Sequence, residues 1–269
     1  MTTATTDATA RATLEGRGIG MDFGGVKALV DVDVALSPGT RLGLIGPNGS
    51  GKTTLLNVLS GVYRPTAGAI AFGERTITGL SPGARGRLGI VRTFQHPQLA
   101  ASLSVRENVE LGAGLARKVH GRGHRADVDG TLAEFGCADY ADGLPDEVPY
   151  GVRKMVEIAR AVVVDGPVLL LDEPAAGLSR EERDELIAAL QALRSRRPEL
   201  ALCLVEHDVR LVAALCDELL VLATGRRLAA GVTDEVLQDE AVRAAYLGEQ
   251  ALEEPAASSP PETVDGGGR

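Results

Sequence analysis

The apolar and polar positions in the first third of the chain follow the short period of β-strands. Residues 28–36, ALVDVDVAL, alternate with a period of two, which is typical of a half-buried strand. The turn sequence SPG follows, and residues 40–45, TRLGLI, then form a short apolar run. Residues 69–77, AIAFGERTI, predict a hairpin that turns at Gly73, and residues 88–94, LGIVRTF, predict another short strand.

Between about residues 96 and 165 the apolar spacing changes to that of helices. The segments SVRENVELGAGLARKV, ADVDGTLAEFG and RKMVEIARAVV carry apolar side chains three and four positions apart. We therefore expect a mainly helical insert in this part of the chain.

Strand-like runs return in the last third. PVLLLD ends at residue 172 and LALCLVE covers residues 200–206, with the helical segment REERDELIAALQALRSRR between them and Ser179 before it as an N-cap. DELLVLATGRRLAAG predicts a late hairpin that turns at Gly225. Buried strands separated by a helix predict an α/β fold, with a mostly parallel sheet and helices on its faces.

The ends of the chain have a different composition from the rest. Residues 1–13 are rich in Thr and Ala, and residues 249–269 consist largely of Pro, Gly, Ser and acidic residues. Both ends are therefore expected to be disordered, and residues 14–248 to form the folded domain. The N-terminus lacks the apolar stretch of a secretory signal, and no uncharged apolar run reaches the roughly 20 residues of a membrane helix.

Composition adds three limits. The chain is 44% hydrophobic but only 3% aromatic, so its core has to be built from Val, Leu, Ala and Ile. The net charge of −9 argues against nucleic-acid binding through a general basic surface. The three cysteines, Cys137, Cys203 and Cys216, are too few and too scattered for a disulfide framework and are expected to be buried apolar residues.

A glycine-rich segment between a predicted strand and a predicted helix provides the main candidate site. The segment GPNGSGKT fits the P-loop pattern G-x-x-x-x-G-K-[ST]. Its backbone N–H groups can converge on phosphate oxygens, the lysine adds a cation for the β- and γ-phosphates, and a threonine hydroxyl can bind Mg²⁺. The predicted nucleotide-binding residues are Gly46, Pro47, Asn48, Gly49, Ser50, Gly51, Lys52, Thr53 and Thr54, with Lys52 also catalytic and Thr53 also a metal ligand.

Acidic residues at the end of a later strand supply the chemistry that hydrolysis needs. Asp172 ends the apolar run VLLLD and suits Mg²⁺ coordination, and Glu173 is placed to orient or deprotonate the attacking water. An ordinary N-cap role is the alternative for these acids. His207 follows another strand and can donate a hydrogen bond to the γ-phosphate, although a lone histidine is more often structural.

Two further histidines, His120 and His124, stand four residues apart in HGRGH. Because glycines surround them, we expect a surface loop here and not a metal site.

The P-loop, RTFQ, YG before a helix, LLLDEP and VEHD, in this order, resemble the motifs of ABC transporter ATPases. The resemblance covers about residues 14–248. It implies a P-loop NTPase fold with a mostly parallel core sheet, an antiparallel β subdomain and a helical subdomain at about 96–165. It also implies that Gln95 is a catalytic residue that senses Mg²⁺ and the γ-phosphate, and that Phe23 stacks on adenine. The alternative for Phe23 is an ordinary core phenylalanine.

The signature motif of this family, Leu-Ser-Gly-Gly-Gln, aligns with Val148, Pro149, Tyr150, Gly151 and Val152. In the family this motif covers the ATP of a partner subunit, so Tyr150 and Gly151 are implied nucleotide-binding residues. Pro149 offers neither a hydroxyl nor an N–H, whereas Gly151 and the helix dipole remain. Importer subunits for branched-chain amino acids look similar at these positions and also in FGGVKAL, VRTFQ, EPAAGL and the terminal AYLGE.

The resemblance implies an ATP- and Mg²⁺-dependent ATPase subunit that energises an importer for branched-chain or related amino acids or small polar solutes. Its implied partners are integral membrane permease subunits, a second ATPase subunit and, indirectly, a substrate-binding protein, at the cytoplasmic face of the membrane. The segment HPQLAASLSVRENV is where such subunits contact the permease. The alternatives are a soluble ATPase switch with a non-membrane partner and an exporter subunit.

Overall fold

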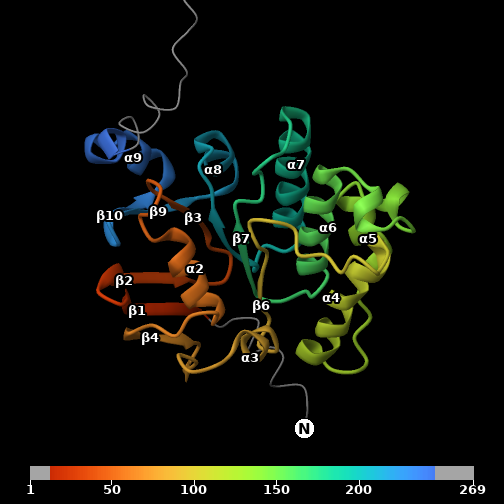
Figure 1. The fold of residues 1–269 in the computed structure, drawn as a ribbon, viewed down its shortest axis with the longest axis horizontal. Coiled ribbons are helices and arrows are strands. Elements are labelled where there is room, and N and C mark those ends of the chain that lie inside the picture. The colour runs from red at the N-terminus through yellow and green to blue at the C-terminus, as the bar shows by residue number, and fades with distance from the viewer. Residues whose placement is uncertain (1–12, 246–269) are drawn as a thin grey trace, which may run out of the picture.

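The computed structural model describes residues 13–245, so predictions about residues 1–12 and 246–269 lie outside the described residues. Two sheets and the helices around them make up the described part of the chain (Figure 1). No helix within residues 13–245 has the length and apolar character needed to cross a membrane.

The larger sheet is mostly parallel, as predicted. Its strand order is β10-β9-β3-β8-β7-β6, and only the edge pair β9–β10 is antiparallel. The strands are β3 (Arg41–Ile45), β6 (Ile90–Arg92), β7 (Val168–Asp172), β8 (Ala201–Val205), β9 (Glu218–Ala223) and β10 (Arg226–Val232). The late hairpin predicted at Gly225 is confirmed by β9 and β10.

The smaller sheet is antiparallel, with the order β2-β1-β4-β5. Its strands are β1 (Leu14–Phe23), β2 (Val26–Leu36), β4 (Ala67–Phe72) and β5 (Arg75–Thr76). The hairpin predicted at Gly73 is confirmed by the pairing of β4 with β5. This sheet forms the lower left of the molecule in Figure 1.

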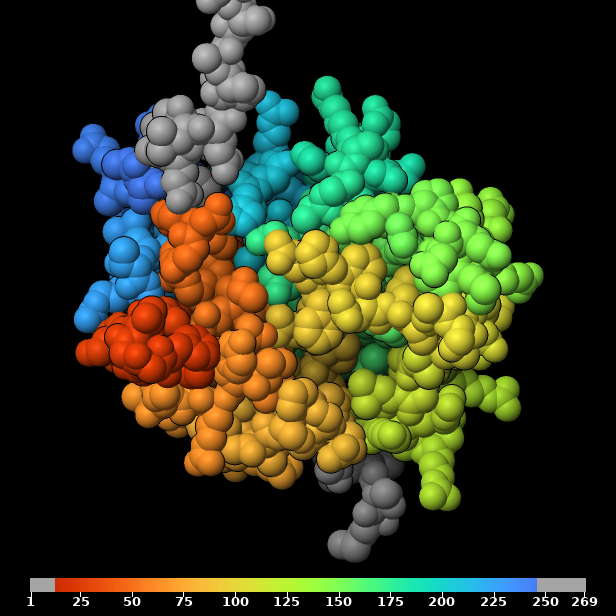
Figure 2. All heavy atoms as spheres, in the orientation of Figure 1, coloured from red at the N-terminus to blue at the C-terminus, as the bar shows by residue number. Residues whose placement is uncertain are grey.

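The predicted helical insert is also confirmed, although its first helix begins only at Val105. The α-helices are α2 (Lys52–Ser60), α3 (Pro82–Gly86), α4 (Val105–His120), α5 (Val128–Glu134), α6 (Tyr150–Val162), α7 (Arg180–Arg196), α8 (Val209–Leu215) and α9 (Thr233–Gln238). Figure 2 shows the α4 and α5 segment, in yellow to green, as a block on the opposite side of the molecule from the red N-terminal strands.

Alternate side chains of the central strands point into two separate cores. Leu202 and Leu204 of β8 belong to the core shared with α4, α6, α7 and α8. Cys203 and Val205 belong to the core shared with α2 and the antiparallel sheet. The three cysteines are free and buried, as predicted. Ser179 caps α7 as predicted: its Oγ accepts the Glu182 N–H at 3.2 Å, and Glu182 accepts the Ser179 N–H at 2.7 Å.

Helix α2, which begins at the P-loop, is held at its other end by a buried arginine. Arg85 is fully buried and donates to the carbonyls of Val58 and Leu59, both at 2.7 Å. It also donates to the carbonyls of Ile77 and Thr78 at 3.0 and 3.2 Å. Burial lowers the pKa of Arg85 to about 10, so the side chain stays charged at neutral pH beside the negative end of the helix.

Arg85→Ala is expected to lower the free energy of unfolding by about 3 kcal/mol or more, because it leaves several buried carbonyls without a donor. Urea unfolding followed by circular dichroism measures the change. Arg87 is exposed on the same short segment, and Arg87→Ala serves as the control, with an expected effect below about 0.5 kcal/mol. Equal effects of the two substitutions would contradict the anchoring role of Arg85.

Candidate active site

The predicted site residues lie where strands of the parallel sheet end. The P-loop follows β3 and leads into α2, Asp172 ends β7, and His207 lies just beyond β8. Asp172 and Leu44 both pair with Val205, so the three strands end at nearly the same level. Ligand sites of parallel sheets form at this edge.

Glycine is required at two positions of the P-loop. Gly46 has a φ of 146°, and a Cβ there would lie 2.1 Å from the Leu222 carbonyl oxygen. Gly51 caps α2 with a φ of 105°, and a Cβ there would lie 2.6 Å from the Ala28 carbonyl oxygen. At both positions the backbone is left-handed, and a backbone carbonyl of another segment lies too close to leave room for a Cβ atom.

A surface pocket joins the P-loop to the predicted catalytic glutamate. It is lined by Ala28, the P-loop residues Asn48, Gly49, Ser50, Gly51, Lys52, Thr53 and Thr54, and Glu173. The Lys52 ammonium is buried and donates to the carbonyls of Gly46 and Pro47 at 2.6 and 2.9 Å. The loop therefore curls around its own lysine, with its backbone lining the pocket.

Two buried oxygen atoms beside this pocket fit a phosphate and a metal ion. Asp172 is 2% exposed, and its Oδ1 has no hydrogen-bond partner. The hydroxyl of Ser50, also buried, has none either. A buried carboxylate oxygen without a donor is costly unless a ligand satisfies it, and carboxylates are preferred Mg²⁺ ligands. The residues present therefore fit bound Mg²⁺ and nucleotide.

The other oxygen of Asp172 pairs with Arg92, which sequence reasoning missed. Arg92 Nη2 lies 2.9 Å from Asp172 Oδ2, and both side chains are almost fully buried. Arg92 also donates to Asn57 and Ser60 of α2, at 2.5 and 3.0 Å. Burial raises the pKa of Asp172, and the charge of Arg92 opposes this rise. Arg92 thus fixes the carboxylate to α2 and leaves Oδ1 available.

Glu173 is held between two other predicted residues. Gln95 Nε2 donates to Glu173 Oε2 at 2.8 Å, and His207 Nε2 lies 2.9 Å from Glu173 Oε1. Glu173 has a φ of 46°, an unusual backbone conformation for this residue type, and its N–H donates to the Val205 carbonyl. The structure therefore brings Gln95 and His207 each into direct contact with Glu173.

Helix α6 supports this cluster with two buried charges that sequence reasoning also missed. Lys154 Nζ donates to the carbonyls of Gln95 and Glu173, at 2.5 and 3.0 Å. One turn later, Glu157 Oε1 accepts the N–H groups of Phe94 and Gln98, both at 3.3 Å. Both side chains are at most 2% exposed. One face of α6 thus holds the loop around Gln95 by three hydrogen bonds and the Glu173 backbone by a fourth.

Tyr150 and Gly151 are the first two residues of the same helix and lie outside the pocket that the P-loop lines. A Cβ on Gly151 would lie 2.0 Å from Glu182 Oε1, and one on Gly177 would lie 2.9 Å from the Tyr150 ring. The first turn of α6 contains no acidic residue, but the Glu182 carboxylate of α7 lies beside Gly151 at this end of the helix. These two residues do not join the Glu173 cluster.

Comparison with known proteins decides the family. The ABC transporter family profile matches residues 29–176, and that of branched-chain amino acid ATP-binding cassette transporters matches residues 226–251. The chain belongs to the ABC transporter ATPases. The ATP-binding cassette fold expected from the sequence is thereby confirmed, and ATP and Mg²⁺ are the general cofactors of this family.

The curated relatives match over nearly their full length. The cassette is 37% identical to the high-affinity branched-chain amino acid transport ATP-binding protein LivG of Salmonella typhimurium, covering 86% of this chain and 96% of LivG. It is 36% identical to LivG of Escherichia coli K12, covering 88% and 98%. It is 35% identical to BraF of Pseudomonas aeruginosa, of the same description, covering 89% and 99%.

Solved structures show the same fold. An ATP-binding cassette of an ABC transporter in its ADP conformation superposes with a TM-score of 0.76 at 28% identity, over 88% of this chain and 99% of that one. A nucleotide-free cassette from an ABC transporter gives 0.70 at 26% identity, over 90% and 98%.

Phe23 does not belong to the core of this cassette. Its side chain is 43% exposed at the end of β1, so the alternative of an ordinary core phenylalanine is wrong. Tyr63 packs against it edge-on, with ring centroids 5.3 Å apart and an interplanar angle of 75°. The stacking of Phe23 on adenine stays a prediction.

Lys154→Met keeps the volume of the side chain but removes both hydrogen bonds to the Gln95 and Glu173 carbonyls. We expect ATP binding to change little and kcat to fall about tenfold to a hundredfold, because the two residues lose their fixed positions. ATPase assays on the assembled transporter and nucleotide binding to the purified cassette separate the two effects. Lys118→Met on the exposed face of α4 is the control. Equal loss of ATP affinity and kcat would contradict a positioning role.

Proposed function

We propose that this cassette is the ATP-hydrolysing subunit of an ABC importer for branched-chain or related amino acids or small polar solutes. The likeness to LivG and BraF over nearly their full length supports the substrate class. The observation that carries the proposal is the contact of Glu173 with Gln95 and His207 at the edge of the P-loop pocket. The cassette would lie at the cytoplasmic face of the membrane, bound to permease subunits.

In the proposed mechanism the P-loop binds and Glu173 acts on water. Backbone N–H groups from Gly49 to Thr54 and the Lys52 ammonium bind the β- and γ-phosphates of ATP. Thr53, Asp172 and Gln95 would hold Mg²⁺, which neutralises charge on the phosphate oxygens when bound. Glu173 orients the attacking water and accepts its proton. His207 holds the Glu173 carboxylate before the nucleotide binds. Because a neutral imidazole has a single N–H, that hydrogen bond would pass from Glu173 to the γ-phosphate when ATP is bound.

Tyr150 and Gly151 are proposed to act on the nucleotide of a second cassette. Their position outside this chain's own pocket supports that division of roles. The N-terminus of a helix attracts phosphate through its unpaired N–H groups and its dipole. The second cassette is either another copy of this chain or a different ATPase subunit.

The carboxylate of Glu173 provides the sharpest test of the mechanism. Glu173→Gln preserves the shape of the side chain but removes its basicity, so ATP binding should persist while turnover falls by about a hundredfold or more. The assay uses the cassette assembled with its permease and partner ATPase. Glu181→Gln, at an exposed position in the first turn of α7, is the control. Normal turnover of the Glu173 variant would remove Glu173 from the chemistry.

The transport role is tested with the partners in place. The cassette should co-purify with an integral membrane permease, and vesicles that contain the complex should accumulate a branched-chain amino acid only with ATP. Co-purification with a non-membrane partner would favour the soluble switch instead. ATP-driven movement of the amino acid in the opposite direction would favour an exporter subunit.

A further inference from the structure

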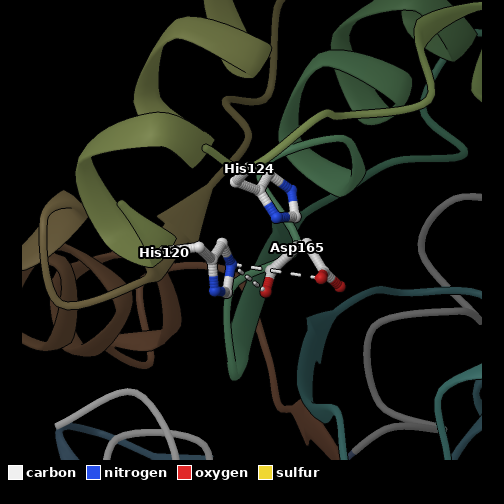
Figure 3. A group of neighbouring side chains, drawn as sticks. All are labelled: His120, His124 and Asp165. Atoms are coloured by element: carbon white, nitrogen blue, oxygen red, sulfur yellow. Dashed lines mark hydrogen bonds and ion pairs between the residues drawn. The ribbon is translucent and has the colours of Figure 1, made fainter. Parts of the chain in front are cut away.

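Two histidines and an aspartate from distant parts of the sequence meet on the surface of the helical segment (Figure 3). His120 is the last residue of α4, so the expectation that it lies in a surface loop is wrong. His124 lies in the turn that follows, and Asp165 lies between α6 and β7. Potential ligand atoms of the three residues all lie within 4.8 Å of one another.

Atoms that could bind a metal ion lie close together in this group. His120 Nε2 lies 2.9 Å from the Asp165 carbonyl oxygen and 4.0 Å from its Oδ2. The rings of His120 and His124 lie side by side, with centroids 4.6 Å apart. A carbonyl oxygen only accepts, so Nε2 carries the His120 proton in this arrangement and Nδ1 holds the lone pair; binding of a metal ion through Nε2 would replace this hydrogen bond, with the proton on Nδ1. A cation at this position would meet nitrogen and oxygen donors together.

The surroundings of Asp165 favour a fixed carboxylate. Asp165 has a φ of 58°, and Arg197 Nε, at the end of α7, lies 3.0 Å from its Oδ1. Arg197 therefore occupies the oxygen that does not face His120. Metal-binding carboxylates commonly receive such a hydrogen bond, which orients the free oxygen toward the ion. The positive charge of Arg197 would repel a bound cation. The negative charge of Asp165, which lies between Arg197 and the proposed cation, offsets this repulsion.

We propose that His120, His124 and Asp165 bind a divalent transition metal ion such as Zn²⁺. Two imidazoles with one carboxylate suit zinc, nickel and copper, whereas Mg²⁺ and Ca²⁺ prefer oxygen ligands only. Ligand atoms around a tetrahedral Zn²⁺ are about 3.4 Å apart, a spacing that follows from metal–ligand distances near 2.1 Å. The three side chains are incompletely buried, so they can close from 4.8 Å to this spacing by rotation.

Bound metal would join three segments of the fold. Its ligands come from the end of α4 and from the turn between α6 and β7, and the outer partner Arg197 comes from the end of α7. The site is separate from the residues that line the P-loop pocket. The inference is therefore independent of the proposed transport function, and its failure would leave that function untouched.

The test is Zn²⁺ binding to the full chain, prepared without a histidine tag and titrated against a chromophoric chelator. About one Zn²⁺ per chain is expected, unaffected by excess Mg²⁺, together with a higher Tm in the presence of Zn²⁺. Substitution of Co²⁺ for Zn²⁺ should give the visible absorption of a site with nitrogen ligands. His124→Ala and Asp165→Asn should each weaken Zn²⁺ binding at least tenfold, and asparagine tolerates the left-handed backbone at position 165.

Matched controls are His96→Ala and Asp139→Asn, which change exposed residues outside the group and should retain full Zn²⁺ affinity. Retained ATP binding shows that each variant is folded. If His124→Ala is unfolded, Asp165→Asn and the Co²⁺ spectrum of the wild type decide the question. The proposal is wrong if the wild type does not bind Zn²⁺, or if His207→Ala abolishes binding while His124→Ala does not.

Discussion

The parallel register of β3, β8, β7 and β6 is the constraint on which the site depends. It places the P-loop, His207, the Asp172–Glu173 pair and the Gln95 loop along one edge, although more than 150 residues separate the P-loop from His207 in the sequence. Because side chains alternate along a strand, a shift of one residue in β7 would exchange the contents of the two cores and turn Asp172 away from Arg92. The two cores therefore fix the register, and the register fixes the chemistry.

Helix α6 holds the site residues in place at this edge of the parallel sheet. Burying Lys154 and Glu157 costs free energy, and burial lowers the pKa of the lysine and raises that of the glutamate. The structure offsets that cost by giving each charge two backbone partners in the loops of the site. As a result, the helix that begins at Tyr150 and Gly151 is connected directly to Gln95 and Glu173. Helix α6 thus carries the two residues proposed to bind a partner's nucleotide. It also holds the residues proposed to act on this chain's own nucleotide.

The sequence predicted most of the fold and the first layer of the site, because both leave local patterns. Alternation identified the strands, and the spacing of Gly46 to Thr54 identified the P-loop. The supporting charges leave no such pattern: Lys154 sits in an amphipathic helix and Arg92 in a short strand, where each resembles a surface residue. Their burial depends on partners 59 and 80 residues away, Gln95 and Asp172. Asp165, 45 residues from His120, was missed for the same reason.

Three local departures from stable protein structure lie at the pocket or next to it. Asp172 keeps a buried oxygen without a donor, Ser50 keeps a buried hydroxyl without a partner, and Glu173 adopts a positive φ. Each costs on the order of 1–3 kcal/mol, and a core under selection for stability alone would remove them. The other oxygen of Asp172 does have a hydrogen-bond donor, Arg92, which also donates to Asn57 and Ser60. Buried nitrogens without a partner also occur away from the pocket, at Arg41, Arg85 and Arg153. A missing partner alone therefore does not mark a binding site. At Ser50 and Asp172 it is the position beside the P-loop and Glu173 that makes a ligand the fitting partner.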